Sequence, residues 1–263
     1  MQERLFWDIL SDVDSADAVA TLTPGWMQGR AAYGGLVGGL LVAGMRQALK
    51  TPKPIRSLMV SFVGPAPAGD VQVVSSVLRE GRNVTQATSQ VRAGDAVCAQ
   101  AMASFGDARE TKAAAPNVEF KPEPRESVPP LEGAGRLLPP FLQYFDGHWT
   151  GGGVPMTGTE DRRLGMWVKH KSDMRSYQAE ALVGLADIPP PVMMSHYKKP
   201  VMASSLSWSL EFLMEPENVK ADWFYLDYTL EAAKDGYSQQ SGMLFTEAGD
   251  LVALSRQCMV YFE

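Results

Sequence analysis

The sequence predicts an α+β protein in which two similar halves each wrap a curved antiparallel sheet around one long helix. Three features predict it: an internal repeat, an apolar helix rich in glycine, and the same order of elements in both halves. The 263 residues are 45% hydrophobic and 21% charged. This balance allows one large or two medium domains with a substantial core.

The repeat relates residues 79–98 to residues 234–253 at an offset of 155, with five of twenty aligned pairs identical. Each copy has an Ala-Gly-Asp turn that leads into a strand-like run. A period of about 150 residues is too long for a solenoid and fits two fused copies of one small domain. The identical pairs are Gly81/Gly236, Ala93/Ala248, Gly94/Gly249, Asp95/Asp250 and Val97/Val252.

The elements follow in matching order. Residues 33–49 form the first helix candidate, although each of its interior glycines lowers helix stability by roughly 1 kcal/mol relative to alanine. Such a helix is stable only inside packed structure, where its glycines let another backbone come close. Residues 173–186 form the second helix candidate. Matching strands follow at 57–65 and 207–216, and the last strand, 251–262, is apolar on both faces, so we expect a helix and a second sheet to cover it.

Residues 109–150 are rich in proline, glycine and charge, and we expect them to connect two domains over the surface. The predicted domains are therefore 1–108 and 151–263. The glycine-rich stretch 147–159 is expected to be a loop.

Composition excludes several classes of function. The net charge of −6 argues against a nucleic-acid partner. The N-terminus lacks the plan of a signal peptide, and the longest uncharged apolar stretch, 31–45, is shorter than the about 20 residues of a membrane span. We expect a cytoplasmic protein without membrane insertion. Cys98 and Cys258 form no disulfide framework or zinc motif, and no histidine spacing predicts a metal site.

Three strings in order resemble the acyl-CoA thioesterase II family and its thioesterase-like relatives: AYGGLVGGLLVAG (32–44), LREGRNVTQATSQV (78–91) and GDLVALSRQCMVYF (249–262). The resemblance covers both halves and omits only the connector. It implies a double hot-dog fold and hydrolysis of an acyl-CoA of lipid metabolism to a free acid and CoA, without a cofactor. The wide sheet is expected to pair with another chain, giving a homodimer or larger assembly.

In that family, one active site forms between the two hot dogs from an Asp, a Thr or Ser, and a Gln of the second half. The resemblance assigns the Asp, at the end of the second helix, to Asp187, and the Gln, on the last strand, to Gln257. It assigns the hydroxyl to Ser205, with Ser204 as the alternative. The Asp-His that follows the hydroxyl in the family is replaced here by Ser-Trp at 207–208.

The residue types allow these roles and also simpler ones. Asp187 faces the negative end of its helix dipole, which raises the pKa of a carboxyl and makes it a better base for water. The alternative is a capping or solvent-exposed aspartate. Gln257 is an amide in an apolar strand and can hold a water molecule, or can link two strands. Its repeat counterpart is Met102, which predicts one active site per chain.

Ser205 alternates with Ser207, Ser209 and Glu211, so the alternative to a functional role is a polar stripe facing solvent. Because the sequence has no Gly-x-Ser-x-Gly motif, we expect this hydroxyl to orient water or substrate and not to form an acyl-enzyme.

Three further residues are candidates for substrate binding. Gly34 and Gly35 open the first helix, where free amides can hold a thioester oxygen that gains charge, although close packing also explains glycine there. Arg82 lies at a turn and can meet the phosphates of CoA, or can simply be solvated.

Two other functions stay open at this stage. A double hot dog can bind acyl-CoA or an acyl chain without hydrolysing it, and the missing Asp-His after Ser205 favours this alternative. A hot-dog hydratase is disfavoured because neither helix candidate carries a histidine.

Overall fold

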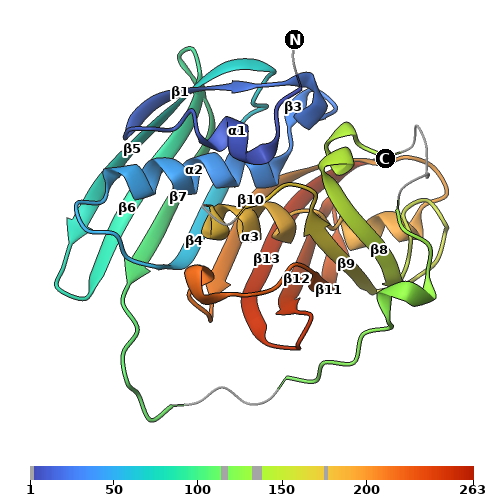
Figure 1. Ribbon diagram of the computed structural model, residues 1–263. Helices are drawn as coiled ribbons and strands as arrows, with labels where there is room; N and C mark the ends of the chain where they lie inside the picture. Colours follow the sequence, from blue (N-terminus) through green and yellow to red (C-terminus); the bar gives the residue numbers. More distant parts are fainter. Residues whose placement is uncertain (1–2, 114–117, 132–137, 175–176) are drawn as a thin grey trace.

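The computed structural model describes residues 3–113, 118–131, 138–174 and 177–263. Within these residues the chain forms an eleven-stranded antiparallel sheet, with α2 and α3 lying across one of its faces (Figure 1). The helices are α1 (Phe6–Leu10), α2 (Gly34–Ala48) and α3 (Gln178–Ala186). The strands of the large sheet are β1 (Asp17–Leu22), β4 (Ile55–Phe62), β5 (Gly69–Glu80), β6 (Val84–Ala93), β7 (Ala96–Gly106), β8 (Phe145–Gly152), β9 (Arg163–His170), β10 (Met202–Phe212), β11 (Phe224–Lys234), β12 (Tyr237–Thr246) and β13 (Leu251–Phe262).

The order of the strands is symmetric about the centre of the sheet, apart from the additional edge strand β8. It runs β1-β5-β6-β7-β4 and then β10-β13-β12-β11-β9-β8, so each half places its strands in the same sequence outward from the middle. The halves join where β4 pairs with β10, from Ser57 opposite Glu211 to Ser61 opposite Ser207. The short β2 (Met27–Gln28) and β3 (Ala31–Ala32) form a separate ribbon.

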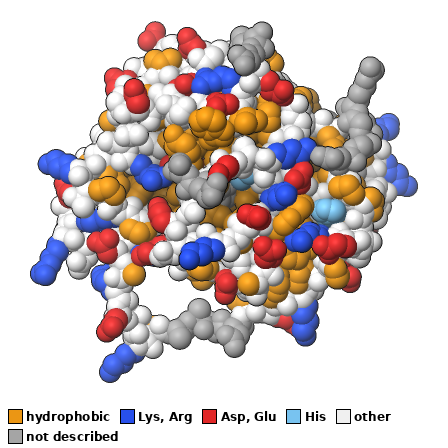
Figure 2. Space-filling view, viewed as in Figure 1, with side chains coloured by type: hydrophobic (Ala, Val, Ile, Leu, Met, Phe, Trp, Pro, Cys, Tyr) orange, Lys and Arg blue, Asp and Glu red, His pale blue; other side chains and the backbone are white. Residues whose placement is uncertain are grey.

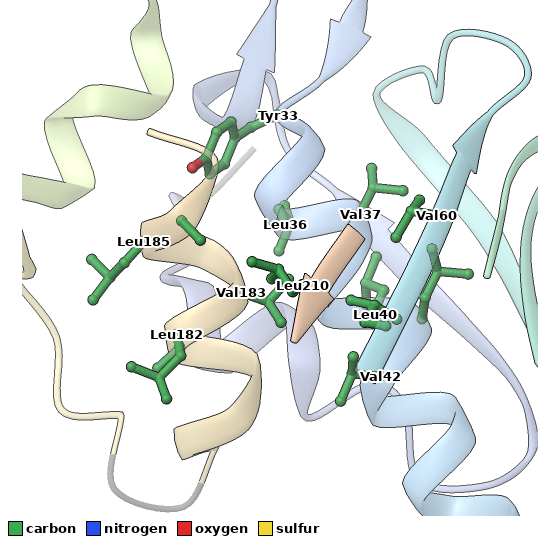
Figure 3. Packing of buried hydrophobic residues seen from close by; sticks show 14 of the residues in the cluster. Tyr33, Leu36, Val37, Leu40, Val42, Val60, Leu182, Val183, Leu185 and Leu210 are labelled. Carbon is green, nitrogen blue, oxygen red and sulfur yellow. The ribbon is translucent and has the colours of Figure 1, made fainter. Parts of the chain in front are cut away.

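The glycines of α2 lie where other elements come close, as the sequence predicts. A Cβ on Gly38 would lie 2.8 Å from Cγ1 of Val183 on α3, and one on Gly39 would lie 3.1 Å from the Phe6 ring of α1. Larger apolar residues of α2, including Leu36 and Leu40, fill the space between the two helices and the sheet (Figure 3). The packing leaves no room for a side chain at these two positions, which explains why glycine stands there despite its low helix propensity.

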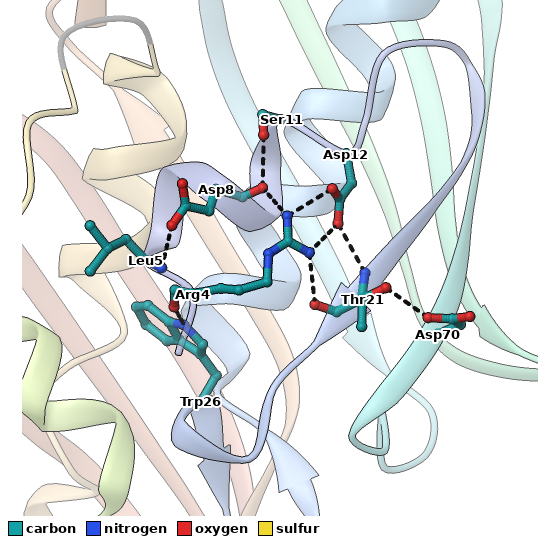
Figure 4. A network of polar contacts seen from close by, with 8 residues as sticks. All are labelled: Arg4, Leu5, Asp8, Ser11, Asp12, Thr21, Trp26 and Asp70. Carbon is teal, nitrogen blue, oxygen red and sulfur yellow. Dashed lines mark hydrogen bonds and ion pairs between the residues drawn. The ribbon is translucent and has the colours of Figure 1, made fainter. Parts of the chain in front are cut away.

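Hydrogen bonds of Arg4 hold the N-terminal segment over these helices. Arg4 donates to both carboxylate oxygens of Asp12, at 2.6 and 2.8 Å, and Asp12 also accepts from the main-chain amide of Thr21 on β1 (Figure 4). Trp26 donates through Nε1 to the carbonyl of Arg4 at 2.8 Å. These bonds hold α1 so that Phe6 packs on both Gly39 and Gly184, one glycine from each central helix.

The last strand differs from the prediction. Its inner face is buried, but Leu254 on the other face is 38% exposed and Phe262 is 59% exposed. Within the described residues the sheet is a single layer, apart from the β2–β3 ribbon, so no second sheet covers β13. The expectation of cover on both sides was wrong for the isolated chain.

The segment expected to be a connector ends in regular structure. Residues 145–152 form β8, which pairs with β9 as an edge strand, so the first part of the glycine-rich stretch is extended and hydrogen-bonded. Before it, a 3-10 helix (Pro140–Tyr144) packs Phe141 on the ring of Tyr33, with 3.9 Å between the ring centroids. The chain between the halves thus reaches the beginning of α2.

The surface carries charges of both signs. On the face shown in Figure 2, acidic and basic side chains are interspersed among apolar ones. Among the described residues, no helix is both long and apolar enough to span a membrane.

Candidate active site

The end of α3 positions the first candidate residue. Asp187 is the C-cap of this helix, with φ −99° and ψ 1°, and the Pro189–Pro191 run that follows prevents the helix from continuing. The helix begins at Gln178, five residues later than predicted, so it is short and buried. Its C-terminal end meets the beginning of α2, because a Cβ on Gly34 would lie 2.7 Å from Oδ2 of Asp187.

Asp187 and Gln257 are in direct contact. Nε2 of Gln257, from β13, donates to Oδ1 of Asp187 at 2.7 Å. The main-chain amide of Gly35 also donates to this carboxylate. Gln257 is buried, whereas Asp187 as a whole residue is partly exposed. The structure therefore brings together Asp187, Gln257 and the two glycines of α2.

The pKa of Asp187 is raised, but mainly for a reason other than the helix dipole that the sequence suggests. Burial raises the pKa of its carboxyl from 3.8 to about 7, and the hydrogen bonds from Gln257 and Gly35 only partly oppose this. The unfavourable end of the α3 dipole is faced by the favourable N-terminal end of α2, so the two helix dipoles oppose each other at this point. Removal of the carboxyl from water is therefore the main cause.

Two buried tyrosines fix the end of α3. The hydroxyl of Tyr33, the residue before α2, donates to the carbonyl of Gly184, and the hydroxyl of Tyr228, on β11, donates to the carbonyl of Ala186. Carbonyls in the last turn of a helix have no partner within the helix, and the two tyrosine hydroxyls supply hydrogen bonds to two of them. Burial raises the pKa of both phenols, which stay neutral beside Asp187.

Ser205 lies on the inner face of the sheet. A β-bulge between Ser205 and Ser207 shifts the register, so that Ser205 lies opposite Met259 while Trp208 lies opposite Gln257. Residues opposite each other on antiparallel strands point to the same face, and Met259 and Gln257 are both buried. Ser205 thus shares the face of Gln257, and no hydrogen bond of its hydroxyl is found within the described residues.

The bulge overturns the polar stripe predicted for β10. Ser207, Ser209 and Glu211 remain together on the outer face, but the extra residue Leu206 moves Ser205 to the opposite face. Ser204, opposite Val260, lies on the outer face. Period-two alternation cannot reveal a bulge, because one inserted residue exchanges the two faces of the strand beyond it.

The repeat offset also slips by one residue along the last strand. The inner-facing residue of β7 that corresponds to Gln257 is Ala103, which is buried opposite Leu58 and Ala87. Met102, the counterpart expected from the offset of 155, is 39% exposed on the outer face. The inference of asymmetry does not depend on the slip, because Ala103 carries no amide either.

Arg82 is not brought to this site. It is exposed in the turn after β5, beside Gly81, whose carbonyl accepts from Lys53 at 3.2 Å just before β4 begins. Asp187 lies instead near Phe62, at the end of β4, since both approach Gly34. The eight residues of β4 span about 25 Å, so the turn and the carboxylate lie at opposite ends of this strand.

One neighbour of the site was missed by the sequence analysis. Gln240, on β12, is fully buried and donates through Nε2 to Oε1 of Gln257 at 2.9 Å. The signal was present, because polar residues alternate on this strand, with Ser238 and Gln240 on its inner face. In a strand with buried residues on that face, polar side chains need partners. Within the described residues, no group of histidine, cysteine and acidic side chains could hold a metal ion.

Comparison with solved structures shows the fold. A hot-dog-fold protein of unknown function from Alicyclobacillus acidocaldarius superposes with a TM-score of 0.84 at 18% identity, over 96% of this chain and 98% of its own. The tesB protein of Mycobacterium avium subsp. paratuberculosis gives 0.79 at 16% identity, over 98% and 100% of the two chains. An acyl-CoA thioesterase II of Mycobacterium marinum gives 0.74 at 16% identity, over 96% of each chain. The fold is therefore a hot dog.

Comparison with protein families also identifies the type of reaction. Residues 22–106 match the family described as the acyl-CoA thioesterase N-terminal domain, and residues 112–261 match the acyl-CoA thioesterase C-terminal domain. Comparison with curated proteins gives no match. The two family matches together cover both halves and confirm the resemblance seen in the sequence. The chain belongs to the acyl-CoA thioesterase family and is a thioester hydrolase.

Proposed function

We propose that the protein hydrolyses an acyl-CoA thioester to a carboxylic acid and CoA at the junction of α2 and α3. The ionised Asp187 accepts a proton from water as the water oxygen bonds to the thioester carbonyl carbon. The C–S bond of the tetrahedral intermediate then breaks, and CoA leaves as a thiolate that takes up the proton from Asp187. A thiolate is a good leaving group, so the reaction needs no cofactor.

The contact between Gln257 and Asp187 carries this proposal. The 2.7 Å hydrogen bond fixes the carboxylate, and burial raises its pKa to about 7, close to the value that suits a general base at neutral pH. A surface aspartate would be a much weaker base.

The beginning of α2 supplies the electrostatic part of the mechanism. The amide of Gly34 has no main-chain acceptor within the described residues, and a Cβ on this residue would lie 2.7 Å from Oδ2 of Asp187. We assign to it the stabilisation of the oxyanion that forms on the thioester oxygen, together with the positive end of the helix dipole. A side chain at this position would crowd the carboxylate of Asp187.

Ser205 completes the proposed water site. Its place on the inner face of the neighbouring strand, two residue pairs beyond the Trp208–Gln257 pair, supports a role in orienting water or substrate. Because Arg82 lies at the far end of β4, its assignment to CoA phosphates has no support from this chain's own geometry.

Several coarser predictions belong to the same proposal. The mirrored strand order supports two hot-dog units, predicted as 1–108 and 151–263 with residues 109–150 between them, although residues 145–150 belong to β8 of the second unit. Met59 and Met102 lie opposite each other on the uncovered face of the sheet, 52% and 39% exposed, and support the predicted homodimer or larger assembly. The cytoplasmic location is carried over from the sequence.

The test is release of free thiol from a panel of short to long acyl-CoAs. We expect turnover by the wild-type protein and a loss of kcat of at least about 100-fold in Asp187→Asn, because the amide cannot accept the proton. The matched control is Asp14→Asn, which changes an exposed aspartate without a hydrogen bond within the described residues and is expected to keep full activity.

Two results would contradict the proposal. Undiminished turnover in Asp187→Asn would keep the reaction but remove the site. Saturable binding of acyl-CoA with no thiol release from any member of the panel would favour a protein that holds acyl-CoA without hydrolysing it.

A further inference from the structure

A second buried glutamine lies behind the candidate site. Gln240 and Gln257 are directly opposite each other on β12 and β13, and their exposed fractions are 0% and 3%. Nε2 of Gln240 donates to Oε1 of Gln257 at 2.9 Å, and Oε1 of Gln240 accepts from the main-chain amide of Val192 at 3.0 Å. Three hydrogen bonds therefore run in series from Val192 to Asp187.

The direction of this series is fixed at Val192. A main-chain amide can only donate, so Gln240 must present its oxygen to Val192 and its nitrogen to Gln257. Gln257 must then present its oxygen to Gln240 and its nitrogen to Asp187. Val192 is the first residue after Pro189–Pro191 with an N–H group, and it begins a 3-10 helix, where amides lack helical partners.

We propose that Gln240 is a positioning residue of the hydrolysis, which acts through Gln257 by holding the donor end of its amide toward Asp187. This role rests on the function proposed above and extends it to a fully buried residue behind Gln257. Without Gln240, the Gln257 amide could reverse and accept a hydrogen bond from a protonated Asp187. Held in its present direction, the amide favours the ionised carboxylate, which is the form that acts as a base.

The groups around the carboxylate allow this effect to be measured. Tyr33 and Tyr228 are the ionisable side chains whose pKa values the charge of Asp187 raises, and both phenols stay neutral, so their charge does not change over the working range. Loss of the hydrogen bond from Gln257 raises the pKa of Asp187 above about 7, since that bond lowers it in the wild-type protein. The rise of kcat with pH should therefore move to higher pH when Gln240 is removed.

The experiment compares Gln240→Leu with Gln239→Leu by thiol release between pH 5.5 and 8.5. Gln239 is the adjacent residue of the same strand, but it lies opposite Cys258 on the other face. We expect Gln240→Leu to lower kcat about 10-fold to 100-fold, with little change in KM, and to move the pH rise upward. We expect Gln239→Leu to change neither.

A double-variant cycle separates positioning from a general structural role. If Gln240 acts through Gln257, adding Gln240→Leu to Gln257→Leu should cause no further loss of kcat. Additive losses, or a Gln240→Leu enzyme with wild-type kcat and pH dependence, would overturn the proposal. If Gln240→Leu does not fold, Gln240→Glu carries the test, because it keeps an acceptor for Val192 while its ionised carboxylate would reverse the Gln257 amide at pH 8.5.

A measurement without substrate distinguishes this proposal from the proposed function. In protein labelled with 13C at aspartate carboxyls, the Asp187 signal is identified by its loss in Asp187→Asn. We expect the titration of that signal to move to higher pH in Gln240→Leu. An unmoved titration would overturn the role of Gln240 even in an active enzyme, whereas a moved titration in a protein that releases no thiol would leave only the proposed hydrolysis in error.

Discussion

At the scale of single residues, the surroundings of Asp187 make its carboxylate a better base but lower the stability of the fold. Its carboxyl is buried enough for its pKa to rise to about 7, yet among the described residues only a glutamine amide and one main-chain amide compensate its charge. A carboxylate on the protein surface would be more stable but a poorer base. Substitution of Asp187 should therefore change both the activity and the stability of the protein.

The stability effect has a definite sign. Because the pKa of Asp187 is raised from 3.8 on folding, the protonated form stabilises the fold, and this contribution is lost as pH rises from about 4 through about 7. At 1.36 kcal/mol per pKa unit, the ionised carboxylate costs the folded state up to roughly 4 kcal/mol at pH 8. Asp187→Asn should therefore be more stable than wild type at pH 8, by at least about 1 kcal/mol in urea unfolding.

The difference should shrink at pH 5, where the wild-type carboxyl is largely protonated in the folded protein. Asp14→Asn serves as the control and should show no such pH dependence. Equal or lower stability of Asp187→Asn at pH 8 would mean that the carboxyl is not buried in the way the structure shows.

At the scale of elements, the close approach of α2 and α3 builds the site. The two helices run antiparallel, since the beginning of α2 meets Asp187 at the end of α3, and Arg46 near the end of α2 binds Glu180 in the first turn of α3 at 2.9 Å. Gly38 allows this approach at the middle of the helices. A small increase in their separation would move Asp187 away from the amides of Gly34 and Gly35.

Gly38→Ala tests this arrangement. The added Cβ would lie 2.8 Å from Cγ1 of Val183 and 3.2 Å from the Trp208 ring. We expect a net loss of about 1–3 kcal/mol in unfolding free energy, even though alanine is the better helix former, together with reduced kcat. Combining Gly38→Ala with Val183→Ala should recover about 1 kcal/mol relative to the sum of the single losses. Strict additivity would show that the helices do not meet at this point.

At the scale of the whole molecule, the overall architecture was predictable because the patterns that indicate it do not depend on the exact register of the strands. The α+β class, both central helices and the family follow from the internal repeat, glycine placement and ordered motifs. Of the four turn glycines that the repeat pairs, Gly94, Gly236 and Gly249 have positive φ, whereas Gly81 does not. These features are local or repeated, so a one-residue error does not remove them.

The details of the site were less predictable because they depend on register. A bulge in β10 places Ser205 on the inner face, and the slipped offset makes Ala103, not Met102, the counterpart of Gln257. The pairing of Gln240 with Gln257 joins two strands whose register is set by a turn with different lengths in the two halves. No pattern along one strand contains that information.

The pH dependence of thiol release, measured for the wild-type protein and Asp187→Asn between pH 5.5 and 8.5, tests the central claim most directly. The structure predicts that wild-type kcat rises with pH, with an apparent pKa of about 7, because only the ionised carboxylate of Asp187 can accept the proton. In Asp187→Asn, the residual rate should be at least about 100-fold lower and should lack this rise. A wild-type rate that is flat over this range, or a rise that persists unchanged in Asp187→Asn, would show that another group is the base.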